Sequence, residues 1–134
     1  RYTAQFLGDV NLFEGKVAGL SGGMADIDWQ GGGRFKATAP EGLSIGQTVW
    51  LGLRPEKMRI GLTKPENGNN MVSGKVDDVG YLGSTSQYHT VLDSTKQRIT
   101  VLRANAGQTA ETSIKWEDKV WIDWPIDAGV VLTR

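Results

Sequence analysis

The feature that most constrains the fold is a short pattern that occurs twice along the 134-residue chain. Residues 11–17 (NLFEGKV) and residues 70–76 (NMVSGKV) share the Asn, the Gly, the Lys and the Val at the same spacing. Further along each half, residues 48–51 (TVWL) are matched by residues 119–122 (KVWI). Because the two patterns occur in the same order in both halves, we predict a duplication of one small unit.

Alternation of apolar with polar or small residues runs through most of the chain and indicates half-buried β-strands. The alternation changes face between Val76 and Val79, which predicts a β-bulge near Asp77 and Asp78. Short helical turns are expected only at residues 3–8 and 110–116. The predicted strands span residues 12–18, 33–38, 48–53, 58–62, 72–81, 86–93, 98–104, 120–124 and 129–133.

The half-repeats, residues 11–62 and 70–134, are joined by a polar connector that contains Pro65 and Gly68. A sheet of so few strands leaves its edges exposed, and closing each half into a barrel or pairing the halves removes those edges. We therefore expect an all-β fold of duplicated OB-like β-barrel units, interleaved with each other and carrying short helical turns.

Composition argues against several classes of function. Fifteen Lys and Arg residues balance fifteen Asp and Glu residues, so the net positive charge that nucleic-acid binding requires is missing. The chain has no Cys and one His, His89, which excludes disulfides and the usual zinc sites and fits a reducing compartment. No apolar run approaches the roughly 20 residues of a membrane-spanning helix. We expect a soluble domain without metal.

Two Gly-Lys pairs, Gly15-Lys16 and Gly74-Lys75, resemble the end of a phosphate-binding P-loop. The P-loop requires a Gly five residues before its second Gly and a hydroxyl residue after its Lys, and neither requirement is met in either half. The sequence therefore predicts no catalytic, cofactor-binding or metal-binding residue. A cation site at Asp77 and Asp78 is disfavoured because adjacent strand residues point to opposite faces.

Five Trp residues allow either core packing or stacking on a ligand. We expect Trp50 and Trp121 to pack in the core. Trp29 precedes a run of three Gly residues and is expected to be exposed.

Four segments resemble a known family. They are residues 6–15 (FLGDVNLFEG), residues 53–57 (LRPEK), residues 81–85 (YLGST) with Tyr88 and His89, and residues 121–124 (WIDW) with 128–132 (AGVVL). Together they resemble the C-terminal TOBE region of ABC importer ATPases, most closely the putrescine and spermidine branch. The resemblance covers nearly the whole chain in the same order and independently agrees with the duplication.

The resemblance implies an organisation for the parent protein. Residues 1–10 would be a linker remnant from a preceding nucleotide-binding ATPase domain, which would bind ATP and Mg²⁺, and residues 11–134 would be the regulatory domain. Its partners would be that ATPase domain, a second copy in a homodimer and the transmembrane permease subunits, at the cytoplasmic face of the inner membrane. The chain itself would not be an enzyme, and it would bind no cofactor or nucleic acid.

The interface and regulatory residues expected from this resemblance lie near the start of the chain and at a charged turn. They are Phe6, Leu7, Gly8, Asn11, Arg54, Pro55 and Glu56. If a polyamine acts as an effector, carboxylates and an aromatic face should meet its ammonium groups. The expected ligand set is Asp77, Asp78 and Tyr81. Two other functions stay open, a small-ligand effector sensor and an OB-type oligonucleotide or sugar binder.

Overall fold

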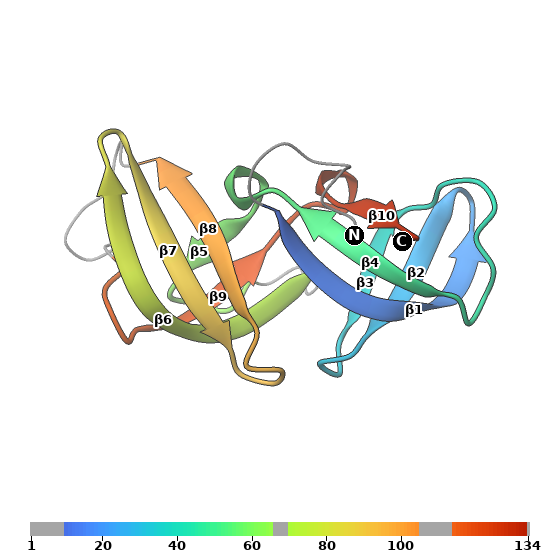
Figure 1. The fold of residues 1–134 in the computed structure, drawn as a ribbon, viewed down its shortest axis with the longest axis horizontal. Helices are drawn as coiled ribbons and strands as arrows, with labels where there is room; N and C mark the ends of the chain where they lie inside the picture. Colours follow the sequence, from blue (N-terminus) through green and yellow to red (C-terminus); the bar gives the residue numbers. More distant parts are fainter. Residues whose placement is uncertain (1–9, 66–69, 105–113, 134) are drawn as a thin grey trace.

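The computed structural model describes residues 10–65, 70–104 and 114–133. Within these ranges the chain forms two five-stranded antiparallel sheets that lie side by side (Figure 1). The elements are β1 (Asn11–Ser21), β2 (Met24–Trp29), β3 (Arg34–Thr38), β4 (Thr48–Leu53), the 3-10 turn η2 (Pro55–Lys57), β5 (Arg59–Gly61), β6 (Met71–Leu82), β7 (Thr85–Leu92), β8 (Arg98–Ala104), β9 (Lys119–Asp123), the 3-10 turn η3 (Ile126–Ala128) and β10 (Val130–Leu132).

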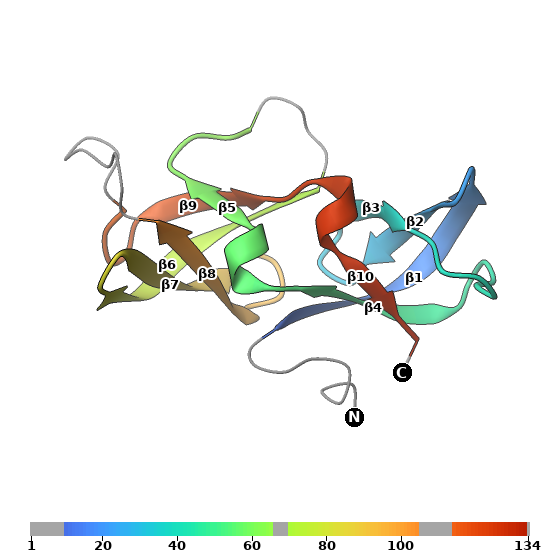
Figure 2. The same cartoon turned by 90° about the horizontal axis from the view of Figure 1, so that it is seen from above.

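The two halves of the chain exchange their last strands. The first sheet has the order β10-β4-β1-β2-β3, and the second has the order β5-β9-β6-β7-β8. The first half therefore contributes β5 to the second sheet, and the second half returns β10 to the first (Figure 2). The edge strands approach each other within each sheet, β3 beside β10 and β5 beside β8. We call the two curled sheets barrel 1 (β1 to β4 with β10) and barrel 2 (β5 to β9). The predicted all-β fold of duplicated, interleaved units is confirmed.

The duplication extends to backbone irregularities. The predicted bulge is confirmed, because the register between β6 and β7 shifts between Val76 and Asp78. A corresponding shift between Val17 and Gly19 in β1 was not predicted. At Gly15 an added Cβ would collide with the carbonyl oxygen of Asp28, and at Gly74 it would collide with that of Val91. The repeated Gly is therefore required by the close approach of the neighbouring strand.

The core of barrel 1 is aromatic and includes a side chain from the other half. Phe13, Trp29 and Phe35 point inward from β1, β2 and β3, and all three are buried. Trp124 follows β9, yet its ring stacks on Phe13 with a centroid distance of 5.4 Å and meets Phe35 edge-on at 5.0 Å. The exchange of strands thus places a second-half Trp in the core of barrel 1.

The expected environments of three Trp residues are wrong. Trp29 is the third inward residue of β2 after Ala25 and Ile27, and it is only 9% exposed. The backbone of Gly31 lies directly against its ring. Trp50 and Trp121 alternate with buried Val, Leu and Ile residues on β4 and β9, so they face outward and are partly exposed. The alternation of inward and outward residues along each strand, and not proximity to glycine, decides whether these Trp side chains are buried.

Strand β2 and the helical segments also differ from expectation. No strand was predicted at β2, which contains two Asp residues, a type that is rare in strands. Its outward Asp28 and Asp26 instead form ion pairs across to β3, with Arg34 at 2.8 Å and Lys36 at 3.3 Å. The expected helical turn at residues 3–8 lies outside the described residues, and residues 114–116 form no helix. None of the helical segments in the described part of the chain is long and apolar enough to cross a membrane.

Candidate functional site

The two barrels are joined by a reciprocal pair of asparagine contacts, which we call the asparagine clasps. Asn11 accepts a hydrogen bond from the backbone N–H of Thr100 at 3.0 Å and donates one to the carbonyl oxygen of Thr100 at 2.7 Å. Asn70 bonds in the same way to Lys36, at 2.7 Å and 2.8 Å. Both amides are buried, with 7% and 2% of the residue exposed. The repeated Asn therefore ties each half to the third strand of the other.

The charged turn with the expected interface residues Arg54, Pro55 and Glu56 connects the two barrels within the chain. Turn η2 follows β4 of barrel 1, leads into β5 of barrel 2 and contacts β8. Pro55 is buried, Arg54 is partly exposed, and Glu56 is exposed. Turn η3 makes the corresponding passage from β9 to β10 and contacts β3 (Figure 2). The charged side chains thus sit at the junction of the barrels, and their role toward a partner surface stays a prediction.

The other expected interface residues fall in two places. Phe6, Leu7 and Gly8 lie outside the described residues. Asn11 lies in its clasp inside the chain, where the opposite barrel already satisfies its amide. The contacts of Asn11 lie within the chain, and its expected role at an interface with a partner stays a prediction.

The three residues expected to hold a polyamine are spread along β6. Asp77 accepts a hydrogen bond from Arg98 at 2.8 Å. Asp78 lies opposite His89 after the bulge, and Tyr81 is 73% exposed near the end of the strand. A pocket that contains Asp77 is lined by neither of the other two residues. The structure therefore does not gather the expected ligand set, whose role stays a prediction.

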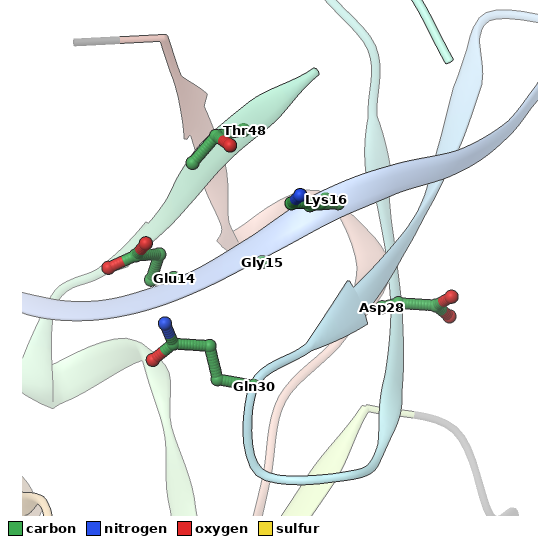
Figure 3. A pocket seen from close by; sticks show the side chains of 6 residues that line it. All are labelled: Glu14, Gly15, Lys16, Asp28, Gln30 and Thr48. Atoms are coloured by element: carbon green, nitrogen blue, oxygen red, sulfur yellow. The ribbon is translucent and has the colours of Figure 1, made fainter. Parts of the chain in front are cut away.

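A pocket of about 280 Å³ lies on the outer face of barrel 1 and was missed by sequence reasoning. It is lined by Glu14, Gly15, Lys16, Asp28, Gln30 and Thr48. Figure 3 shows the Glu14 carboxylate and the Gln30 carboxamide on one side of Gly15, with Lys16 on the other side. The Asp28 carboxylate is held by Arg34, and its hydrogen bond, followed by its negative charge, raises the pKa of Arg34. The signal that could have found the pocket is a comparison of these positions with their counterparts in the other half.

The corresponding place in barrel 2 is filled by an ion pair. The Asp93 carboxylate accepts hydrogen bonds from the Lys119 ammonium and, at 2.8 Å, from the Ser73 hydroxyl. The bond from Lys119 lowers the pKa of Asp93, burial opposes that shift, and the Ser73 bond and the nearby charges of Lys119 and Lys96 reinforce it.

A pH dependence of stability follows from this ion pair. Because the pKa of Asp93 is lower in the folded chain than its ordinary value of 3.8, the carboxylate stabilises the fold above about pH 4. That contribution is lost as the pH falls through the folded pKa. Asp93→Asn should therefore destabilise the chain at pH 6 and have a smaller effect at pH 3, as urea titrations at the two pH values would measure. An equal effect at both values would contradict the ionic contribution.

The family model of the TOBE domain matches residues 51–132, more than half of the chain. The chain belongs to the TOBE domain family. The expected family is confirmed, and the matched region of the TOBE domain runs from within β4 to the end of β10.

Curated relatives of this TOBE domain are ATP-binding proteins of polyamine importers. The putrescine transport ATP-binding protein of Escherichia coli is 35% identical over 99% of this chain. A spermidine/putrescine import ATP-binding protein of Chromobacterium violaceum is 34% identical over 100% of the chain, and one of Rubrobacter xylanophilus is 42% identical over 66%. The chain spans only 35%, 37% and 23% of the lengths of these three proteins.

A solved structure supports the fold of the TOBE domain. The cytoplasmic molybdate-binding protein ModG, crystallised with molybdate bound, superposes with a TM-score of 0.81 over 92% of this chain and 96% of that chain. The two sequences are 17% identical, so the likeness concerns the fold alone. It agrees with an architecture of two OB-like units.

Proposed function

We propose that this TOBE domain is the C-terminal regulatory and dimerisation region of an ATP-binding subunit in an ABC importer for polyamines. The observation that supports this most directly is the similarity along essentially the whole chain to ATP-binding proteins named for putrescine and spermidine import. Because the chain corresponds to about a third of those proteins, ATP and Mg²⁺ would bind in a preceding domain of the parent subunit.

In this proposal the domain acts by contact and not by chemistry. Its partners are the preceding ATPase domain, a second copy of the subunit and, through the ATPase domain, the permease at the cytoplasmic face of the inner membrane. A regulatory domain changes a motor only if its contacts differ between the motor's states. The exchanged strands and the buried asparagine clasps join the barrels into one unit, which suits it to carry a displacement from one contact surface to another.

A chimeric importer tests the proposal. Residues 10–134 would replace the aligned C-terminal region of the Escherichia coli putrescine transport ATP-binding protein in cells that lack the native subunit. We expect uptake of labelled putrescine to be restored, since the chain carries the contacts of that region. The matched control is the same subunit truncated before the region, at equal abundance on an immunoblot. Uptake no higher than that of the truncated subunit would contradict the proposal.

A second expectation concerns Glu56 in the same chimera. Loss of a fixed charge from a desolvated contact costs about 2 to 5 kcal/mol, enough to shift a balanced two-state motor. Glu56 is exposed in this chain, so Glu56→Ala should leave the melting temperature of the isolated chain nearly unchanged while it lowers putrescine uptake. Glu41→Ala, at another exposed position, is the control and should leave uptake unchanged. Normal uptake with Glu56→Ala would remove Glu56 from the partner surface.

An effector-sensing role is the second candidate, and the pocket on barrel 1 is the observation that favours it. Concave sites with a few convergent polar groups are typical of small-ligand binding. This role is compatible with the first, because an effector could act on the motor through the same domain.

A further inference from the structure

The strands around the pocket in barrel 1 pair in the same register as the corresponding strands of barrel 2. Gly15 lies between Val49 and Trp29 in barrel 1, as Gly74 lies between Val120 and Leu92 in barrel 2. The backbone N–H of Gln30 donates to the carbonyl oxygen of Glu14 at 3.1 Å, and that of Asp93 donates to the carbonyl oxygen of Ser73 at 3.0 Å. Thr48 is paired with Lys16, and Lys119 with Lys75. The pocket residues Glu14, Gln30 and Thr48 therefore correspond to Ser73, Asp93 and Lys119.

This correspondence explains why barrel 1 has a pocket. In barrel 2, β6 lies between β9 and β7, and the side chain of Lys119 starts on β9 and reaches Asp93 beyond the end of β7. Its path crosses the outer face of β6 beside Gly74, which is paired with Val120 on one side and with Leu92 on the other. In barrel 1 the corresponding residue is the short Thr48, and the space above Gly15 is the pocket of about 280 Å³. The pocket thus occupies the place that a lysine side chain fills in the other barrel.

The polar groups of the pocket can accept hydrogen bonds from an ammonium group, as Asp93 does from Lys119 in barrel 2. In the part of the chain that the structure describes, the Glu14 carboxylate and the Gln30 carboxamide take part in no side-chain hydrogen bond or ion pair, and both line the pocket. Each offers an oxygen acceptor to a cation. Lys16 adds a positive charge near the position proposed for the ammonium. Its counterpart Lys75 lies beside Lys119 in barrel 2, where Lys119 nevertheless forms its ion pair with Asp93. Gly15 and Thr48, which carry no charge, line the rest of the path that an alkyl chain would take.

We propose that this pocket binds a primary alkylammonium ion about as long as a lysine side chain. The ammonium would lie between Glu14 and Gln30, and the alkyl chain would lie over Gly15 toward Thr48. The ligand is a small free amine, which would replace in barrel 1 the internal ammonium that Lys119 supplies in barrel 2. Binding of such an amine to the chain does not depend on the proposed transport function.

The test is a titration of the ¹⁵N-labelled 134-residue chain with n-butylamine hydrochloride at constant pH and ionic strength. We expect saturable shifts centred on the amides of Gly15 and Gln30, with a Kd on the order of 10⁻³ to 10⁻² M for so small a ligand. The neutral 1-butanol has the same chain length and should bind about tenfold more weakly, because a charge-assisted hydrogen bond is lost. Unsaturable shifts, equal binding of 1-butanol, or shifts centred on another surface would overturn the proposal.

Four variants locate the site. Glu14→Gln should weaken n-butylamine binding about tenfold, and Gln30→Asp, which copies Asp93, should tighten it. Thr48→Lys should abolish binding because the new side chain fills the pocket. Lys119→Thr should create a second saturable site whose shifts centre on Gly74. Retention of the remaining amide spectrum shows that each variant is folded. Unchanged affinity in Thr48→Lys, or no new site in folded Lys119→Thr, would overturn the proposal.

Discussion

Trp124→Ala is expected to lower the free energy of unfolding by about 3 to 5 kcal/mol, as removal of a buried aromatic side chain from a core typically does. Trp124 is only 2% exposed, and its ring contacts Phe13 and Phe35 in barrel 1 although it belongs to the second half. The substitution therefore leaves a cavity at the place where the second half enters the core of the first. Chemical denaturation followed by circular dichroism would measure the loss.

Two variants calibrate that result. Trp116→Ala removes the same kind of side chain from a site that is 65% exposed, and it should change stability by less than about 0.5 kcal/mol. Trp124→Phe keeps a ring in the core and removes the indole N–H, which has no hydrogen-bond partner among the described residues. It should therefore cost much less than Trp124→Ala. Equal losses for Trp116→Ala and Trp124→Ala would contradict the shared aromatic core.

Asn70→Ala is expected to cost about 2 to 4 kcal/mol, since it removes two partly buried hydrogen bonds and leaves both backbone partner groups unpaired. The substitution deprives the backbone N–H and carbonyl groups of Lys36 of their partner in the opposite half. Asn11→Ala should cost a similar amount through Thr100. Denaturant titrations of the two single variants would measure both losses.

A variant that keeps the size of the Asn70 side chain tests whether both hydrogen bonds of the clasp are needed. Asn70→Asp keeps the size of the side chain and the acceptor for the Lys36 N–H, but it loses the donor to the Lys36 carbonyl oxygen at 2.8 Å. If the clasp acts through both bonds, Asn70→Asp should still destabilise the chain. A loss below about 0.5 kcal/mol in Asn70→Ala would show that the barrels do not depend on the clasps.

The sequence predicted the architecture because the relevant signals are local and repeated. The N-x-x-x-G-K-V pattern identified the first strand of each half, and the change of face after Val76 identified the bulge. The exchange of β5 and β10 follows from the need to cover strand edges, so interleaving could be expected before any contact was known. Strand β2 escaped prediction because Asp26 and Asp28 are stabilised by ion pairs with the neighbouring strand.

Contacts between distant segments could not be predicted in the same way. Nothing near Asn11 in sequence indicates that its amide bonds to Thr100, 89 residues away. Trp124 was assigned to the end of a strand, but not to the core of the other barrel. The pocket depends on the small difference between Thr48 and Lys119, which matters only once the register places both side chains beside a repeated Gly. Such features require the three-dimensional alignment of the two halves.

Regulation of an importer ATPase by this domain, as proposed above, can be measured as the number of ATP molecules hydrolysed per putrescine transported. The purified chimeric importer, reconstituted in vesicles, would be compared with the importer truncated before the TOBE region. We predict that the truncated importer hydrolyses more ATP per putrescine and that residues 10–134 restore the ratio of the native importer. An identical ratio in truncated and chimeric importers would contradict the proposed regulation.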